Sequence, residues 1–579
     1  MSIPSTTVIV RRPRWPWLAL AVGLAWTALI RAPMIANAVD HLDSDLAVDG
    51  LTLLDMVHGR FRWHFPGTPY MGIAPILAAL PQALAWGATP ATLVSGGGVI
   101  WLLVVSSTFW LMWRALGPGP AAWGLLPLVC SSVGTVWLSS RVTGGHLLTL
   151  AWHNLAIVGF LGCAGSGKRR GIPILGIWCG LGLYLDPMFL FTLAGLASAA
   201  AVAWWAGGRS RRGLSLVVLF LAGVALGIVP REIGRLVDPY DCYPAQFELT
   251  LEPRAVLEHW RLLTFRALPR LISGIELPGL GWVTENPFSA IPYVVSLSGR
   301  GPRAPGPFAV GSELLSIGLM VFFAVCVSRV IREAIRPRDS AGALAARAAT
   351  VSALLIIPAF LFNKNVYNSD NYRYLVYLLT PWTMGFGLWF RDLAGRGTAR
   401  AIVAIALASI FVELATSGLF HWYRDVRAYL DQAGRPIVMD HSSWMELELW
   451  NPRDRRQRSV SFSDYSIPAD ATHVMGSYWD VYLIAFLSAG RMTGVPFPMY
   501  PNRFPGWSRG LAPGQGKLIV FSPNRPPSPV PSTPADEPST FSRRVSSSRG
   551  LDWRPALGTL WRAEGRDPAE INRLTIEVP

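Results

Sequence analysis

Charged residues are scarce in this chain. Asp, Glu, Lys and Arg together make up 15% of the 579 residues, whereas a soluble protein usually carries about 25%. Hydrophobic residues make up 51%, and the mean hydropathy is +0.35. Apolar runs close to the ~20 residues that span a bilayer recur along the sequence. The composition therefore excludes an ordinary soluble protein and predicts a polytopic α-helical membrane protein.

Cysteine is also scarce, and no two cysteines form a CxxC pair. The chain has five: Cys130, Cys163, Cys179, Cys242 and Cys326. Four of them lie inside or beside apolar runs, so the sequence has neither a disulfide framework nor the pattern of a structural metal site. The formal net charge is +15. Many of the arginines lie in short loops between apolar runs, so we interpret this charge as a sign of membrane topology and not of nucleic-acid binding.

The apolar runs predict about eleven membrane spans, and basic clusters orient them. Basic residues mark the cytoplasmic side, and with eleven alternating spans the clusters "RRPR", "KRR", "RSRR", "RVIREAIRPR" and "RDLAGRGTAR" all fall on that side. This predicts an N-terminus inside and a C-terminus outside, in the inner membrane of a bacterium. We interpret the first span as an uncleaved anchor. The predicted spans are residues 15–37, 92–113, 119–139, 146–164, 171–187, 188–206, 213–230, 312–331, 343–362, 374–390 and 400–419.

Large pieces of the chain then lie outside, around a transmembrane domain at residues 1–420. Two are the loops 38–91 and 231–311. The apolar stretch 71–87 is short and contains Pro75 and Pro81, so it is predicted to be a juxtamembrane or re-entrant element. A strand, helix, strand pattern at 469–497 predicts a small external α/β domain over 421–521. Residues 522–579 are predicted to form a Pro/Ser-rich linker and a short tail with a strand pair.

The first external loop carries acids directly beside the first span. It reads "HLDSDLAVDGLTLLDMVHGRFRWHFPGTPYMG" from residue 41 to 72. If "DSDLAVDGLTLLDMV" is helical, Asp45 and Asp49 are spaced i, i+4 and share a face. A carboxylate beside a low-dielectric membrane can have a raised pKa and act as a general base. The alternative is that these acids belong to a solvated loop.

This loop resembles the first external loop of the GT-C superfamily. The resemblance rests on "SDLAVDGLTLLDMVHGRF" followed by "FPGTPYMG". It is strongest to bacterial relatives of protein O-mannosyltransferases and of the lipid A aminoarabinose transferase. Asp45 matches the family's Asp, but Leu46 stands where many members have Glu and Thr68 where many have Gln. "NYRYLVYLLTP" and "GSYWDVYLIAFLSAGR" are similar to later segments of the family.

The resemblance implies an inverting glycosyltransferase that uses a polyprenyl-phosphate sugar as donor. Asp45 would be the base that deprotonates an acceptor hydroxyl. Asp49 stands where relatives are usually apolar, and it is a candidate supporting acid because it shares the helix face of Asp45. Cations near the membrane surface would hold the lipid phosphate, and the candidates are Arg373, Lys364 and Arg141, with Tyr372 as a hydroxyl donor. The partners would be the lipid-linked donor, membrane lipids and an acceptor that is a protein, a lipid or a glycan, with no nucleic acid.

One expected feature is missing. The family often places another acid in the second external loop, but here "SSRVTGGHLLTLAWHN" has His146 and no acid. His146 would contact the acceptor or hold a proton, or it is a helix-start histidine that packs on a neighbouring span. No cofactor is predicted, and a divalent metal is not favoured because Asp45 and Asp49 alone supply too few oxygen ligands.

Two other function classes compete with the transferase. A lipid-linked sugar flippase is disfavoured because no internal repeat is visible. A degenerate transferase that only scaffolds envelope enzymes is favoured by the missing acid. Arg373 has a plain alternative too, since an arginine at the end of a span can snorkel to the interface.

Overall fold

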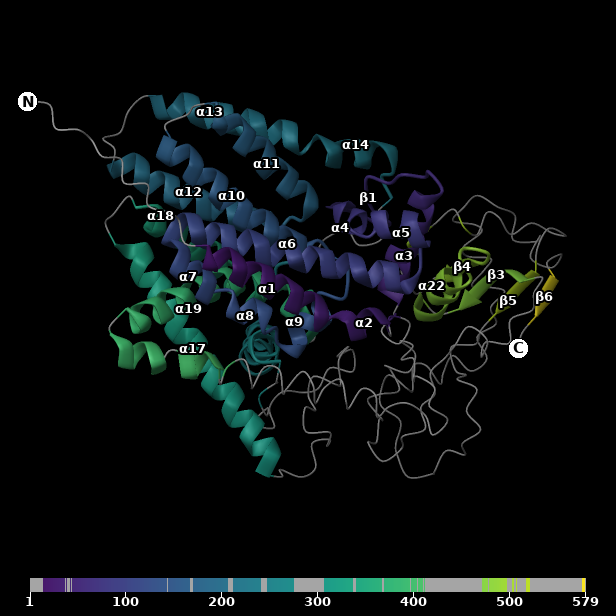
Figure 1. Cartoon of the computed structure of the whole chain (residues 1–579). Helices are drawn as coiled ribbons and strands as arrows, with labels where there is room; N and C mark the ends of the chain where they lie inside the picture. Colours follow the sequence, from purple (N-terminus) through teal and green to yellow (C-terminus); the bar gives the residue numbers. More distant parts are fainter. Residues whose placement is uncertain are drawn as a thin grey trace, which may run out of the picture.

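The computed structural model describes three parts of the chain. They are residues 14–277, apart from gaps at 37, 39–41, 43, 143, 167–169, 207–211, 241–246 and 275–276; residues 307–411, apart from 337–339, 367–368, 396, 404 and 410; and the C-terminal pieces 471–476, 478–496, 502–504, 507, 517–520 and 575–577. The long helices form a bundle, and a small sheet lies at one end of it beside the first external helix (Figure 1).

The bundle is built from apolar helices. Among the described residues, five helices are long and apolar enough to cross a membrane: Trp15–Ala36, Pro90–Leu116, His146–Ala164, Ser215–Val237 and Ala341–Leu361. Shorter apolar helices are Gly171–Leu185, Phe189–Trp205 and Thr398–Ser409. The protein is therefore an integral membrane protein, whereas the number of crossings and the orientation of the termini stay predictions. The helix bounds are α1 Trp15–Leu29, α2 Ala32–Ala36, α6 Pro90–Leu116, α10 His146–Ser166, α11 Gly171–Leu185, α12 Phe189–Ala206, α13 Arg212–Gly227, α17 Pro307–Ile335, α18 Ala341–Leu361 and α19 Leu379–Ala394.

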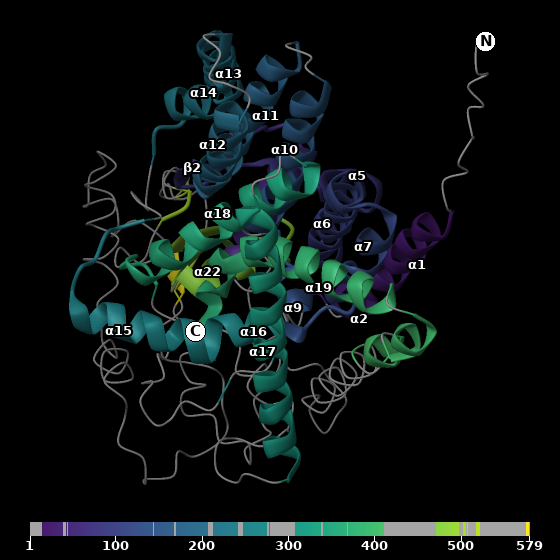
Figure 2. The ribbon, with the colours of Figure 1, turned by 90° about the vertical axis from the view of Figure 1, so that its left-hand side faces the viewer.

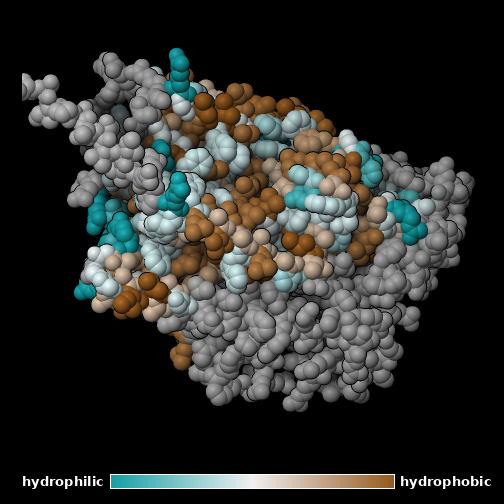
Figure 3. All heavy atoms as spheres, in the orientation of Figure 1, coloured by the Kyte–Doolittle hydropathy of each residue, from teal (hydrophilic) through white to brown (hydrophobic). Residues whose placement is uncertain are grey.

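Hydrophobic side chains cover the outside of this bundle. They gather on the face over α13 in Figure 3, where Val217, Val218, Leu221 and Leu226 are exposed. An exposed apolar face of this kind is expected to contact lipid, because exposing so much apolar surface to water is unfavourable.

The predicted span at 119–139 is wrong as a single helix. The chain forms three short helices there: α7 Pro118–Trp123, α8 Leu126–Val129 and α9 Val133–Leu138. Prolines explain the interruption, since Pro120 and Pro127 lack the N–H that a continuous helix needs. The predicted span at 374–390 likewise starts as a 3₁₀ helix, Ser369–Leu378, before α19.

Small residues let two helices of the bundle touch closely. Gly176 and Gly180 of α11 face Gly223 and Gly227 of α13. A Cβ atom at Gly180 would lie 2.2 Å from the carbonyl oxygen of Val224. Glycines four residues apart on both helices are the pattern that allows backbone contact between membrane helices.

The external pieces beside the bundle are short elements. Residues 71–87 form no long helix, in agreement with the predicted juxtamembrane element. The bounds are α3 Ser44–Val57, β1 His64–Phe65, β2 Thr68–Gly72, α4 Ala74–Leu77, α5 Leu80–Trp86, α14 Val229–Val237, α15 Pro253–Leu262, a π-helix Leu263–Ala267 and α16 Leu268–Ile272. Figure 2 shows α15 and α16 on the side of the molecule where α17 begins to cross the bundle.

The C-terminal part forms a four-stranded parallel sheet in the order β4-β3-β5-β6. Its elements are β3 Ala471–Gly476, α22 Tyr478–Leu487, β4 Thr493–Pro496, β5 Lys517–Val520 and β6 Thr575–Glu577. The strand, helix, strand prediction is confirmed. β6 joins the same sheet through β5, so the sheet takes strands from both sides of the predicted Pro/Ser-rich linker, which lies outside the described residues.

Helix α22 packs directly on α3, and a glycine makes this possible. A Cβ atom at Gly50 would lie 2.4 Å from Cζ of Phe486 on α22. Phe486 is buried. The glycine of the first external loop therefore brings the C-terminal domain against the acids of that loop.

A candidate active site between the first external loop and the C-terminal domain

Asp45 is the accessible one of the two predicted acids, Asp45 and Asp49, of helix α3. The predicted helix is confirmed, and Asp45 lies in its first turn, where the positive end of the helix dipole favours a carboxylate. The Asp45 side chain is 31% exposed. Asp49, one turn later, is 1% exposed. Only Asp45 of this pair is therefore within reach of an acceptor. Asp43, the predicted cap, lies outside the described residues.

Two residues of the C-terminal part contact Asp45. The hydroxyl of Tyr478, the first residue of α22, donates a hydrogen bond of 2.6 Å to Oδ1 of Asp45. A guanidinium nitrogen of Arg503 lies 3.9 Å from the same oxygen, and Nε of Arg503 donates to the Tyr478 hydroxyl at 3.3 Å. The carboxylate thus has one neutral donor and one cation supplied from a part of the chain far away in sequence.

Three guanidinium groups set the protonation state of Asp45. Burial by itself raises the pKa of this carboxyl, but Arg503, the Tyr478 hydrogen bond, Arg373 and Arg141 together lower the pKa below its ordinary value. The sequence led us to expect a raised pKa, and this was wrong because the expectation considered the membrane and not the cations. Two of the predicted phosphate ligands, Arg373 and Arg141, thus lie near enough to Asp45 for their charges to act on it, and Arg503 is a third cation there. A role of these arginines at a phosphate stays a prediction.

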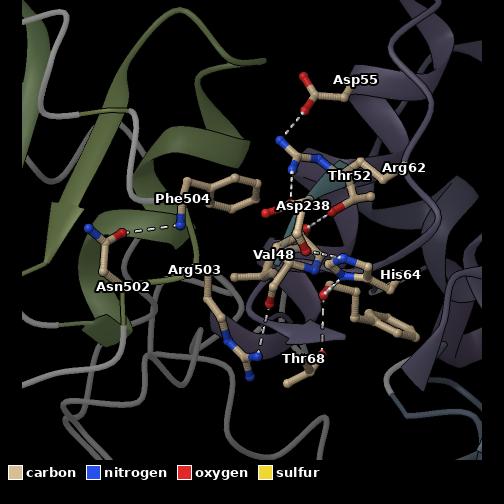
Figure 4. A network of polar contacts seen from close by, with 12 residues as sticks. Val48, Thr52, Asp55, Arg62, His64, Thr68, Asp238, Asn502, Arg503 and Phe504 are labelled. Carbon is tan, nitrogen blue, oxygen red and sulfur yellow. Dashed lines mark hydrogen bonds and ion pairs between the residues drawn. The ribbon is translucent and has the colours of Figure 1, made fainter. Parts of the chain in front are cut away.

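Arg503 also forms a hydrogen bond to the first external loop. It donates from its guanidinium to the carbonyl oxygen of Pro66 at 3.1 Å, and its backbone N–H donates to the Tyr482 hydroxyl at 2.7 Å. Figure 4 shows Arg503 pointing from the C-terminal domain towards the loop that carries Thr68. The turn in "FPGTPYMG" is therefore held beside Asp45 by a side chain from the opposite domain.

His146 has an acidic partner. Its Nδ1 lies 2.7 Å from Oδ2 of Asp186, and the two side chains are 4% and 0% exposed. Asp186 directly follows α11, and its other oxygen accepts the backbone N–H of Met188 at 2.8 Å. An acid from the connection between α11 and α12 thus lies beside His146, although the second external loop itself has none.

Tyr374 links this pair to Arg373. The edge of the His146 ring meets the face of Tyr374 at 5.2 Å between centroids, and the Arg373 guanidinium lies 5.4 Å from the same ring. Arg373 is close enough to Asp45 to lower the pKa of its carboxyl. His146, Tyr374 and Arg373 are therefore successive neighbours, and the charge of Arg373 acts on Asp45.

Two predicted phosphate ligands have other contacts. Nζ of Lys364 lies 2.6 Å from a carboxylate oxygen of Glu248, and both side chains are more than half exposed. Tyr372 is buried, and its hydroxyl donates to the carbonyl oxygen of Gly134 at 2.8 Å. Neither residue contributes to the charges around Asp45, and a role at a phosphate stays a prediction for both.

Among the described residues, no group of three or more His, Cys, Asp or Glu side chains is arranged to hold a metal ion. The prediction that no metal or cofactor takes part stays untested.

Sequence reasoning missed three residues of this constellation. Tyr478 stands in the quoted "GSYWDVYLIAFLSAGR", so the motif could have pointed to it. Asp186 was visible as an acid at the end of an apolar run. Arg503, in "PNRFPGW", carries no signal, because only the packing of α22 on α3 brings it to Asp45.

Comparison with known proteins finds likeness in structure only. No family model matches the chain, and no curated protein is similar in sequence. Solved structures are similar over most of the chain. ArnT from Cupriavidus metallidurans bound to undecaprenyl phosphate matches with 10% identity and a TM-score of 0.47 over 86% of this chain and 92% of that one. AglB, the oligosaccharyltransferase of Archaeoglobus fulgidus, matches in complex with an inhibitory peptide and a dolichol-phosphate, with 14% identity and a TM-score of 0.46 over 86% of this chain and 67% of that one.

The chain is similar in fold to these two solved structures. The apo form of the Archaeoglobus enzyme gives a comparable match, with 15% identity and a TM-score of 0.45 over 87% of this chain and 66% of that one. Since every one of these TM-scores is below 0.5, what the chain does is inferred from its own residues.

Proposed function

We propose that this protein is an inverting membrane glycosyltransferase that moves a sugar from a polyprenyl-phosphate donor to an acceptor hydroxyl outside the membrane. The observation that carries the proposal is a single partly exposed carboxylate, Asp45, with Arg503, Arg373 and Arg141 around it. A base beside a cluster of guanidinium groups is the arrangement that attack by a hydroxyl and departure of a phosphate require.

In this mechanism Asp45 takes the proton of the acceptor hydroxyl. The acceptor oxygen forms a bond to the anomeric carbon as the bond from that carbon to the phosphate oxygen breaks. The lipid phosphate leaves with the bonding electron pair, and the guanidinium groups stabilise its negative charge. Attack from the side opposite to the leaving group inverts the anomeric carbon.

The low pKa of Asp45 fits this sequence of events. A carboxylate that cations hold ionised is ready to accept a proton at neutral pH, but it is a weak base. Binding of the donor phosphate draws the same guanidinium groups towards the phosphate. Their attraction for Asp45 then weakens and its pKa rises, so the base becomes stronger only when the donor is present.

The buried His146 and Asp186 pair supports the transferase over a degenerate scaffold. The missing second acid was the main ground for the scaffold, and Asp186 lies 2.7 Å from His146. We propose that the pair positions Tyr374 and, through it, Arg373.

The test is release of lipid phosphate by the purified full-length protein in detergent. Two of the similar structures hold undecaprenyl phosphate and dolichol phosphate, so both lipids are used, each carrying a hexose or a pentose. Wild-type protein should release the polyprenyl phosphate as the sugar passes to water or to an added alcohol, and Asp45→Asn should release it about 10²–10⁴ times more slowly. Transport of a fluorescent lipid-linked sugar across vesicles without any release would instead identify a flippase.

A further inference from the structure

A cleft of about 450 Å³ lies further along α3 than Asp45. Its walls come from α3, from residues 58–64 that follow it, from the end of α14 and from the C-terminal domain. Its volume falls in the range of about 300–1,000 Å³ that is usual for small-ligand sites. None of the residues of the catalytic constellation lines it.

The polar lining of the cleft is a balanced set of charges. Asp55 pairs with Arg60 at 2.7 Å and with Arg62 at 3.3 Å, and Arg62 reaches Asp238 at 3.7 Å. Figure 4 shows Arg62 between the two carboxylates, with His64 close to Asp238. The negative charges of the two acids balance the positive charges of the two guanidinium groups. The cleft therefore offers hydrogen-bond donors and acceptors but no net positive charge to attract an anion.

The remaining lining is aromatic. Phe61 is 53% exposed, and its ring meets Trp63 edge to face at 5.4 Å. Across the cleft, Trp507 stacks on Phe504 at 4.4 Å, and the Arg62 guanidinium lies 5.3 Å from the Phe504 ring. Rigid rings on two sides can cover the apolar faces of a flat ligand.

We propose that this cleft binds neutral sugar units of the acceptor, which makes the acceptor a glycan; this inference rests on the proposed function. A pyranose or furanose ring has an apolar C–H face and a rim of hydroxyls that both donate and accept. The aromatic walls match the face, and the Asp55–Arg62–Asp238 network matches the rim. A phosphate would need an excess of cations, which this cleft lacks.

The position of the cleft sets the size of the acceptor. Asp55 is ten residues after Asp45 on α3, which corresponds to about 15 Å along the helix axis. One sugar cannot touch both places. The acceptor is therefore an oligosaccharide whose distal units lie in the cleft while a terminal hydroxyl reaches Asp45.

The test is direct binding without donor. The full-length protein in detergent is titrated with maltohexaose, mannohexaose and an arabinan hexasaccharide, with an oligogalacturonate and a Ser/Thr-rich decapeptide for comparison. At least one neutral glycan should bind. Phe61→Ser and Arg60→Gln change exposed side chains of the cleft, and each should weaken that binding by about tenfold. Trp86→Ser and Arg254→Gln change exposed residues elsewhere and should leave it unchanged.

Asp45→Asn separates this inference from the proposed function. The variant should bind the neutral glycan like the wild type although it releases lipid phosphate much more slowly. If the wild-type protein shows no turnover but binds a neutral glycan, and Phe61→Ser weakens that binding, only the proposed transferase activity is contradicted. The saccharide site is refuted if no neutral glycan binds, if only the acidic glycan or the peptide binds, or if binding is the same in Phe61→Ser.

Discussion

Replacing Asp45 by Asn tests the chemistry most directly. Asn keeps the shape of Asp, and its amide oxygen can still accept the 2.6 Å hydrogen bond from Tyr478. It cannot take a proton. Removal of a general base typically costs about 10²–10⁴ in rate, or about 3–5 kcal/mol of transition-state stabilisation. We expect a loss of turnover in that range.

The cost in stability should be much smaller. Changing a hydrogen bond to a charged acceptor into one to a neutral acceptor loses about 1 kcal/mol. The contact with Arg503 at 3.9 Å is partly exposed, and such a pair contributes about 0–1 kcal/mol. The sum is too small to unfold the protein, so a loss of turnover above a hundredfold has to come from the reaction itself.

The assay is release of polyprenyl phosphate at equal amounts of monodisperse protein. Asp392→Asn is the matched control, because Asp392 is also a carboxylate held by arginines, Arg329 and Arg391, and is 26% exposed. It should keep wild-type turnover. Asp49→Asn should cost less than Asp45→Asn, since Asp49 is buried. Near-full turnover of Asp45→Asn would refute the base, and loss confined to Asp49→Asn would move that role to Asp49.

Four further outcomes follow from the same geometry. Arg373→Ala should lower kcat/KM for the donor more than Arg373→Lys, because Lys keeps the charge but loses the paired N–H groups. Equal donor kinetics in wild type and Arg373→Ala would show that Arg373 only snorkels to the interface. Cations lower the pKa of Asp45 in the protein without donor, so kcat/KM for the donor, which reports the free protein, should persist as pH falls to the ordinary value of 3.8. Arg503→Gln removes one cation and should move the acidic limb of the kcat/KM profile to higher pH; an unmoved limb contradicts this. Gly50→Ala places a methyl 2.4 Å from Phe486, and this overpacking costs about 1–3 kcal/mol against about 1 kcal/mol gained in helix propensity. Turnover should therefore fall, and adding the smaller side chain of Phe486→Leu should restore it. Unchanged turnover in Gly50→Ala would show that the packing of α22 does not position the site. A reporter fused behind the last predicted span should be active only outside the membrane, and activity inside would overturn the predicted topology.

The sequence by itself determined the membrane class, most helices and the central acid. Apolar runs fix helices in a bilayer because each backbone polar group must be satisfied within its own segment, so a local pattern is enough to predict them. The i, i+4 acids of α3 and the strand, helix, strand of the C-terminal domain are local patterns too. The predicted span 119–139 failed as a single helix in part because Pro127 interrupts an otherwise apolar run, and the predicted span 374–390 starts as a 3₁₀ helix.

Tertiary structure alone decided what surrounds Asp45. Tyr478 lies 433 positions away in the chain, and it reaches the carboxylate because Gly50 lets α22 pack on α3. Arg503 arrives with the same domain, and it helps to turn an expected rise in the pKa of Asp45 into a fall. Asp186 meets His146 only after α10 and α11 have packed together. Charge interactions depend on distance in space, and the spacing of residues along the sequence does not give the distance between the first external loop and the C-terminal domain.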